Sequence, residues 1–124
     1  MSRRDALRGY LLHIAANTDE PVTLSSEEIW VAFASEFEDF NNFDQAFSDA
    51  LVWLSEGGFV RFGSRPAGTN GECAVVDLVA TPQGVEAERQ ASVQTPELNK
   101  KIALNLDSAD MLGCFIGERQ NSEG

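Results

Sequence analysis

The acidic residues, Asp and Glu, are the residues of this sequence whose number and spacing could support binding or catalysis. The chain has 20 Asp and Glu residues against nine Lys and Arg, which gives it a formal charge of -11. Half of the acidic residues lie between Arg8 and Arg61, an interval that contains no Lys or Arg. Such a block attracts basic partners and repels nucleic acid and anionic membranes. A block of this kind is also typical of a solvated face that keeps a protein in solution, and the sequence leaves both interpretations open.

Patterns for catalysis or metal binding are not found in the sequence. His13 is the sole histidine and has no sequence cue to a catalytic partner, so we expect a solvated or capping role for it. The segment GSRPAGTNG lacks the Lys-Ser/Thr ending of a phosphate-binding loop. The segment EFEDF lacks the spacing, the central Gly and the terminal Glu of a calcium loop. We therefore expect a non-enzymatic protein with no cofactor and no bound metal.

Cysteine usage and hydropathy indicate a reducing, aqueous compartment. Cys73 and Cys114 are far apart and belong to no C-x-x-C pair, so we expect reduced thiols rather than a disulfide or a zinc site. No apolar run approaches the roughly 20 residues of a membrane span, and the N-terminus lacks the apolar segment of a signal peptide. We expect a cytoplasmic protein that does not bind membranes.

Three helices are expected to carry the acidic block within a single folded unit. The chain has 124 residues, of which 43% are hydrophobic and 23% charged, so it has the composition of a globular protein with one core. Apolar residues at helical spacing predict a first helix from a Ser2 cap to about Ala16. The loop NTDEPVT follows, and a capping box of Ser25 and Glu28 then predicts a second helix from near Ser26.

The third helix is expected to begin near Phe43, because the acidic and Asn-rich segment EFEDFNN should break the second helix near Phe37 to Asn42. Its apolar residues recur at helical spacing and predict a buried stripe of Phe43, Phe47, Ala50, Leu51 and Leu54. The opposite side then carries Gln45, Asp49, Val52 and Glu56. Gly57-Gly58 should end this helix, because glycine accepts the left-handed conformation of a C-cap.

A β-hairpin and further helices are expected after the Gly-Gly stop. The segments FVRF and CAVVDLVA are rich in strand-forming residues and are joined by the turn-rich segment GSRPAGTNGE. Thr81 as N-cap and Pro82 at the first helical position predict a fourth helix that ends near Ser92. A short last helix should then present an apolar stripe of Met111, Leu112, Phe115 and Ile116. The spacing of Gly113 and Gly117 in it is compatible with a homodimer through this helix or with its folding back on the same chain.

Together these elements resemble the winged helix-turn-helix superfamily. The segment VDLVATPQGVEAE is similar to the L-T-P-x-G pattern that follows the wing in PadR-like and MarR-like proteins. The resemblance implies an α+β fold, with a winged-helix domain (three-helix core plus β-hairpin wing) over residues 1–92 and a linker with additional C-terminal helices over residues 93–124. In DNA-binding relatives the third helix enters the major groove and the wing contacts the backbone or the minor groove. For this chain the resemblance therefore implies Gln45, Ser48, Arg61 and Arg65 as the residues that would contact DNA.

The charge of the third helix argues against DNA binding. It carries Asp44, Asp49 and Glu56 and no basic residue, and a like charge near a phosphate costs about 1 kcal/mol even in a water-like dielectric. We therefore expect a protein that binds a basic protein partner, through an acidic face formed by Glu36, Glu38, Asp39, Asp44, Asp49, Trp53 and Glu56. For Trp53, packing in the core is the other interpretation.

Small acidic proteins of this kind resemble phage or mobile-element inhibitors, such as anti-CRISPR and other anti-defence proteins, and immunity or antitoxin proteins. The resemblance implies that such a protein covers a basic nucleic-acid-binding surface of its partner. The alternative hypothesis is a DNA-binding transcriptional regulator of the winged helix-turn-helix type. Both hypotheses use the same fold and differ in the partner of the third helix.

Overall fold

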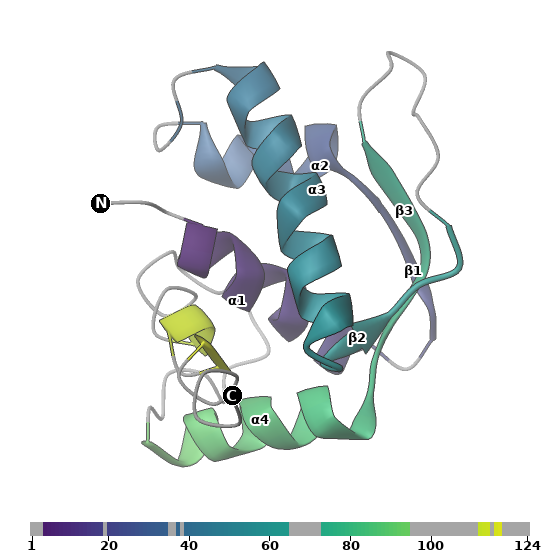
Figure 1. Ribbon diagram of the computed structural model, residues 1–124, viewed down its shortest axis with the longest axis vertical. Helices are drawn as coiled ribbons and strands as arrows, with labels where there is room; N and C mark the ends of the chain where they lie inside the picture. Colours follow the sequence, from purple (N-terminus) through teal and green to yellow (C-terminus); the bar gives the residue numbers. More distant parts are fainter. Residues whose placement is uncertain are drawn as a thin grey trace.

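The computed structural model describes residues 4–18, 20–34, 37, 39–64, 73–94, 112–114 and 116–117. Its elements follow the order α1 (Arg4–Ala16), β1 (Val22–Ser25), α2 (Ser26–Phe33), α3 (Phe40–Glu56), β2 (Val60–Arg61), β3 (Ala74–Ala80) and α4 (Pro82–Gln94). The strands form a three-stranded antiparallel sheet in the order β1-β3-β2, which lies beside α3, while α4 crosses below α1 and α3 (Figure 1). The expected α+β class is confirmed, and this order of elements is compatible with a winged helix.

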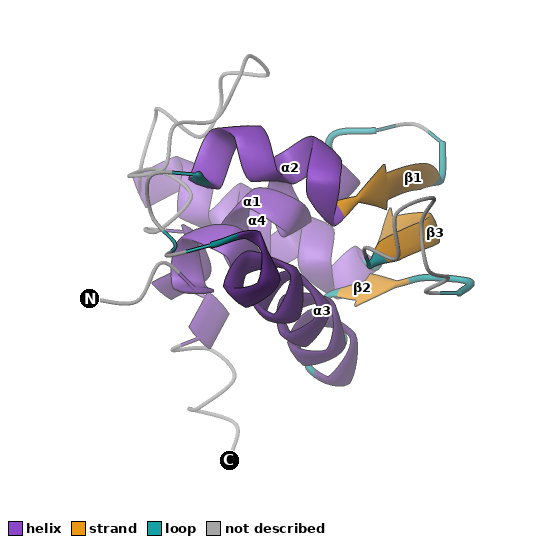
Figure 2. Ribbon diagram, turned by 90° about the horizontal axis from the view of Figure 1, so that it is seen from above, coloured by secondary structure: helices purple, strands orange, loops and turns teal. Residues whose placement is uncertain are grey.

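The core is assembled around α3. Its inward side is buried over its whole length, as the apolar stripe predicted: Phe43, Ala46, Phe47, Ala50, Leu51 and Leu54. α1 and α2 pack their apolar sides against this stripe, and the sheet lies at one side of the helices (Figure 2). The ring of Phe43 lies 5.6 Å from that of Phe33 and 5.3 Å from that of Phe37, measured between centroids. Such aromatic pairs contribute about 0.5 to 1.5 kcal/mol beyond the area they bury.

The start of α2 is confirmed and the start of α3 is corrected. The Ser25 hydroxyl accepts a hydrogen bond from the Glu28 N–H (3.3 Å), and the Glu28 carboxylate accepts one from the Ser25 N–H (3.4 Å). α2 already ends at Phe33, and α3 begins at Phe40 rather than near Phe43. The expected start of α3 was wrong because Asp39 is its N-cap, with its Oδ1 accepting from an N–H of the first turn at 2.8 Å.

The end of α3 is the Gly-Gly stop that the sequence predicted. Gly58 has a φ of 80°, in the left-handed region. The Gly58 N–H donates to the Ser55 carbonyl (3.1 Å), and the Phe59 N–H donates to the Leu54 carbonyl (2.9 Å). These are the two hydrogen bonds of a Schellman motif, and the side chains of Leu54 and Phe59 are both buried, as that motif prefers.

Strand β1 lies partly where the sequence predicted a loop. Val22 pairs with Leu78, and Leu24 pairs with Val75, so β3 contains one more residue than β1 between these two pairs. Asp77 lies within this bulge and has a φ of 60°, which Asp tolerates better than most residues. The strand has four residues and no strict alternation of exposed and buried positions, so its pairing with β3, and not its local pattern, defines it.

The hairpin and the start of α4 are confirmed. Val60 pairs with Ala80 and Arg61 with Val79, while the tip of the hairpin, residues 65–72, lies outside the described residues. The Thr81 hydroxyl accepts a hydrogen bond from the Gly84 N–H (3.1 Å), which makes it the expected N-cap. The same hydroxyl donates to the Gly58 carbonyl, so the cap of α4 is tied to the end of α3.

Gly84 explains why a glycine follows the Thr-Pro pair. A Cβ atom at this position would lie 2.0 Å from the carbonyl oxygen of Phe59 and 3.1 Å from a methyl carbon of Leu12. The Phe59 carbonyl is held in place because it accepts a hydrogen bond from the Thr81 N–H at 3.0 Å. Without a side chain, the first turn of α4 can approach the backbone that follows α3.

The C-terminal segment packs on the same core. Leu112 and Ile116 are fully buried in the cluster that α1 to α4 form, and Figure 1 shows these turns beside α1 and α4. A Cβ added to Gly117 would contact nothing within 4 Å, so the close approach that its spacing with Gly113 suggested is not found at Gly117. Met111 and Phe115, the other residues of the expected stripe, lie outside the described residues. Leu112 and Ile116 therefore pack against the core of their own chain.

Two further expectations concern the cysteines and the membrane. Cys73 is half-buried, Cys114 is exposed, and neither forms a disulfide bond. Over the described ranges, every helix is too short or too polar to cross a bilayer.

Replacing Gly84 with Ala should lower the free energy of unfolding by roughly 2 to 3 kcal/mol, because the new methyl group would overlap a fixed backbone carbonyl. The clash outweighs the gain of about 1 kcal/mol that Ala normally brings to a helix. Chemical denaturation followed by circular dichroism measures this change. Gly117→Ala is the matched control, since its methyl group would meet open space. Equal stability of Gly84→Ala and wild type would contradict the close approach of α4.

Candidate binding surface on helices α2 and α3

The side of α3 opposite the core is the first candidate surface, and we call Gln45, Asp49, Val52 and Glu56 the α3 face. Gln45, Asp49 and Glu56 are exposed, and Val52 is half-buried. Gln45 Nε2 donates a hydrogen bond to Asp49 Oδ1 at 3.1 Å, as residues one turn apart can do. Asp49 and Glu56 lie two turns apart, about 10 Å along the helix axis. Neither α2 nor α3 contains a Lys or Arg that could neutralise these carboxylates.

Asp44 is placed differently from the α3 face. Its Oδ1 accepts a hydrogen bond from the Ser26 hydroxyl and a second one from the Cys73 N–H at 2.8 Å. Ser26 is buried and opens α2, while Cys73 lies just before β3. This carboxylate therefore joins three elements of the fold, and we do not include it in the α3 face.

Other acidic residues of the block start helices. Asp39 caps α3, and Glu28 closes the capping box of α2. A negative charge at a helix N-terminus is stabilised by the helix dipole, by about 0.3 to 1 kcal/mol at an exposed position. Glu36 and Glu38 lie outside the described residues. The acidic block thus divides into carboxylates that build the fold and carboxylates that face solvent.

Trp53 packs within the chain. It is half-buried, its ring stacks against that of Phe59 with centroids 5.9 Å apart, and the Arg8 guanidinium carbon lies 4.2 Å from its ring centroid. The cation–π contact with Arg8 joins α1 to α3 and contributes on the order of 0.5 to 1 kcal/mol. This geometry supports the core-packing interpretation of Trp53 rather than a free aromatic anchor.

The residues expected for DNA binding are spread over α3 and the hairpin. Gln45 is exposed and Ser48 is half-buried on α3, and Arg61 is exposed on β2. Arg65 lies outside the described residues. Arg89, another exposed arginine, lies on α4 and pairs with Glu86 at 2.7 Å. Among the described residues of the hairpin, Arg61 is thus the basic residue that could contact DNA bound to α3.

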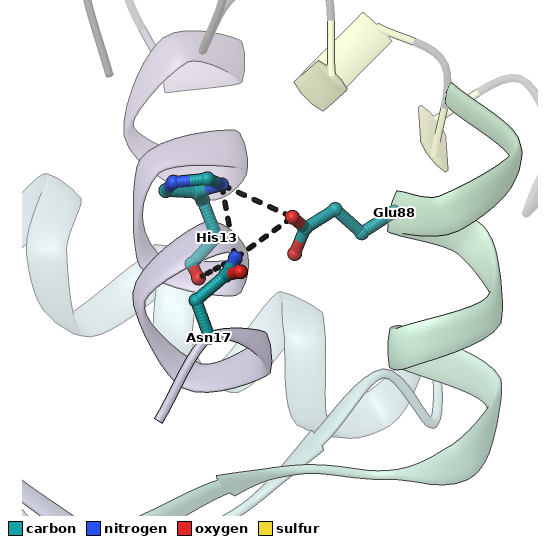
Figure 3. A network of polar contacts seen from close by, with 3 residues as sticks. All are labelled: His13, Asn17 and Glu88. Carbon is teal, nitrogen blue, oxygen red and sulfur yellow. Dashed lines mark hydrogen bonds and ion pairs between the residues drawn. The ribbon is translucent and has the colours of Figure 1, made fainter. Parts of the chain in front are cut away.

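A buried polar cluster joins α1 to α4, and the sequence did not predict it (Figure 3). His13 Nδ1 lies 3.1 Å from Glu88 Oε1, and Asn17 Nδ2 donates to the same oxygen at 2.8 Å. His13 and Glu88 are each only 7% exposed, so the expected solvated or capping role of His13 was wrong. The spacing in α4 could have indicated that Glu88 is buried. Glu88 follows Gly84 by one helical turn and therefore lies on the same, inward side of the helix.

The described residues contain no group of three or more His, Cys, Asp or Glu side chains placed to hold a metal ion together. Comparison with protein-family models, curated protein sequences and solved structures gave no match to this chain.

Replacing Asp44 with Ala should destabilise the protein by about 2 to 3 kcal/mol, because the Cys73 N–H and the Ser26 hydroxyl would lose their acceptor in a poorly solvated place. Asp49→Ala should change the free energy of unfolding by less than about 0.5 kcal/mol, as is usual for exposed positions. Urea unfolding of both variants provides the comparison. If the two variants lose the same stability, the division of the acidic block is wrong.

Proposed function

We propose that this protein is a non-enzymatic, acidic winged-helix module that binds a basic surface of another protein. The winged-helix assignment is supported by the order of elements: α1, α2 and α3, then the β2–β3 hairpin, then α4 with its Thr-Pro-x-Gly start. The packing reasons for Thr81 and Gly84 support it further, because they account for the residues that carry the resemblance to PadR-like and MarR-like proteins.

The α3 face is the observation that carries this proposal. In DNA-binding winged helices the corresponding side of the third helix faces the major groove, whereas here it presents Asp49 and Glu56 with no basic residue on α2 or α3. Duplex DNA carries about one negative charge per 1.7 Å of its axis, so this side of α3 would be repelled from it. A surface rich in Lys and Arg would be attracted instead, which raises the rate of association.

The partner surface that fits this face best is one that normally binds nucleic acid. Such surfaces are strongly positive and match carboxylates spaced along a rigid helix. The protein would then compete with nucleic acid for its partner, as phage or mobile-element inhibitors of the anti-CRISPR, anti-defence or immunity type do. Within this proposal, Asp49 and Glu56 supply the charge, and Asp44 and Trp53 hold α3 in place.

A DNA-binding transcriptional regulator is the second candidate function. It is favoured by the exposed positions of Gln45 on α3 and Arg61 on β2, since an amide can read an adenine edge and an arginine can contact a phosphate. Asp49 and Glu56 oppose it, because they occupy the same side of α3 as Gln45.

A gel shift with duplex DNA at stepped salt concentrations separates the two functions. We expect no retarded band even at about 0.05 M salt, where electrostatic binding is strong. Binding that survives at about 0.15 M salt and disappears when Arg61 and Arg65 are both changed to Ala would support the regulator and overturn the inhibitor.

Charge reversal of the α3 face tests the protein-binding function directly. Tagged protein is incubated with host proteins that were first retained on heparin, and duplex DNA is then added as a competitor. We expect wild type to retain a basic protein that the DNA displaces. Asp49→Lys/Glu56→Lys should weaken retention by at least about tenfold, since like charges brought together across an interface cost several kcal/mol.

The control for this experiment carries the same change in net charge at another place. Glu20→Lys/Glu86→Lys alters one exposed residue before β1 and one half-buried residue on α4. It should retain the partner as wild type does. Equal loss in both double variants would indicate a response to net charge alone and would contradict a specific role of the α3 face.

A further inference from the structure

The polar cluster between α1 and α4 contains a buried oxygen atom without a hydrogen-bond partner, and the proposed function does not use it. Glu88 Oε2 is buried and accepts no hydrogen bond from the described residues, although Glu88 Oε1 contacts both His13 and Asn17. A buried carboxylate oxygen without a donor costs on the order of 1 to 3 kcal/mol or more. Each unsatisfied group of this kind in a well-packed protein calls for a partner.

We propose that His13, Asn17 and Glu88 form a binding site for a divalent transition-metal ion such as Zn²⁺. Asn17 directly follows α1 and lies one helical turn after His13, to whose carbonyl its N–H donates at 3.1 Å, so the two side chains project from the same side. Glu88 reaches toward them from α4, and Figure 3 shows the three side chains converging between the two helices. Imidazole and carboxylate are the protein ligands that zinc takes alongside thiolate.

The distances within the cluster match those between neighbouring ligands of one ion. His13 Nδ1 lies 3.1 Å from Glu88 Oε1, Asn17 Nδ2 lies 3.2 Å from His13 Nδ1, and Asn17 Nδ2 lies 2.8 Å from Glu88 Oε1. Donor atoms about 2.0 to 2.2 Å from a zinc ion are about 2.8 to 3.1 Å from their neighbours in an octahedral arrangement and about 3.3 to 3.6 Å in a tetrahedral one, so the cluster fits the octahedral range. Small side-chain rotations would therefore place the three groups around one ion.

Metal binding changes the tautomer of the His13 ring and the orientation of the Asn17 amide. Because a carboxylate oxygen only accepts, the 3.1 Å contact with Glu88 Oε1 assigns a hydrogen to His13 Nδ1 in the metal-free chain. The ion takes the place of this hydrogen at Nδ1, and the ring then carries its one hydrogen on Nε2, so the exchange releases no net proton. The Asn17 amide turns its oxygen toward the ion and gives up its 2.8 Å hydrogen bond to the His13 carbonyl. With both carboxylate oxygens of Glu88 bound to the ion, Oε2 gains the partner that it lacks.

The cluster also has a route to solvent. His13 and Glu88 are buried, but Asn17 is exposed, so the side of the cluster that Asn17 occupies is open to water. Water molecules can complete the coordination from this side. A site with one imidazole, one carboxylate and one amide favours Zn²⁺, Co²⁺ or Ni²⁺ over Ca²⁺, which requires six to eight oxygen ligands.

Metal titration of the full chain tests this site. The exposed Cys114 is first changed to Ser, so that its thiol does not bind the metal. In this background we expect Zn²⁺ to raise the melting temperature and Co²⁺ to give visible d–d absorption without a thiolate charge-transfer band. Glu88→Gln keeps the shape of the side chain and should weaken Zn²⁺ binding by at least about tenfold. Loss of a residue that only hydrogen-bonds to a metal ligand already costs about tenfold or more in affinity, and Glu88 is itself a ligand in this proposal.

Two variants make the outcome decisive. Glu86→Gln changes a carboxylate on the same helix that pairs with Arg89, and it should bind Zn²⁺ as the parent does. Asn17→His replaces the weak amide ligand with a second imidazole one turn from His13, and it should bind Zn²⁺ more tightly. The proposal is overturned if Zn²⁺ and Co²⁺ have no effect on the parent protein, if Glu88→Gln binds as the parent does, or if Asn17→His fails to tighten binding.

Discussion

Burial of one side of α3 determines what the other side can present to a partner. Phe43, Phe47 and Leu54 are fully buried between α1, α2 and the sheet. Rotating α3 by one residue would turn such side chains toward water at about 1.5 to 3 kcal/mol each, so the orientation of the helix is fixed. Asp49 and Glu56 consequently face solvent on a rigid element. The charge of the α3 face is thus a consequence of the core.

The ends of α3 are held as firmly as its middle. At its start, Asp39 supplies the cap and Asp44 binds the first residue of α2 and the residue before β3. At its end, Gly58 allows the turn that places Phe59 under α4. Acidic residues near the start of α3 therefore stabilise the fold. The carboxylates that face solvent are fewer than the sequence suggests. This division makes the α3 face specific enough to test with two substitutions.

Local features of this fold could be predicted from the sequence, because their causes lie within a few residues. The buried stripe of α3, the Ser25 capping box, the Gly57-Gly58 stop and the Thr81 cap depend on helical spacing and on side chains close to the helix ends. The acidic exposed side of α3 follows from the same spacing.

Features whose partners are distant in the sequence could not be predicted in this way. β1 exists because β3 pairs with it, and the role of Asp44 depends on Ser26 and Cys73, which no periodicity connects to it. The same holds for His13, whose burial depends on Glu88 in α4. The cap formed by Asp39 is local, yet the prediction missed it. The acidic segment that ends one helix also supplies, with its last carboxylate, the cap of the next helix.

The electrostatic potential at the surface of α3 is the quantity on which the proposed function depends most directly. It can be measured by NMR from the relaxation that small cationic and anionic paramagnetic probes cause at backbone amides. We predict that the cationic probe relaxes the amides of Gln45, Asp49 and Glu56 more strongly than the anionic probe does. Stronger relaxation of these amides by the anionic probe would contradict it, because the α3 face would then be suited to phosphate rather than to a basic protein.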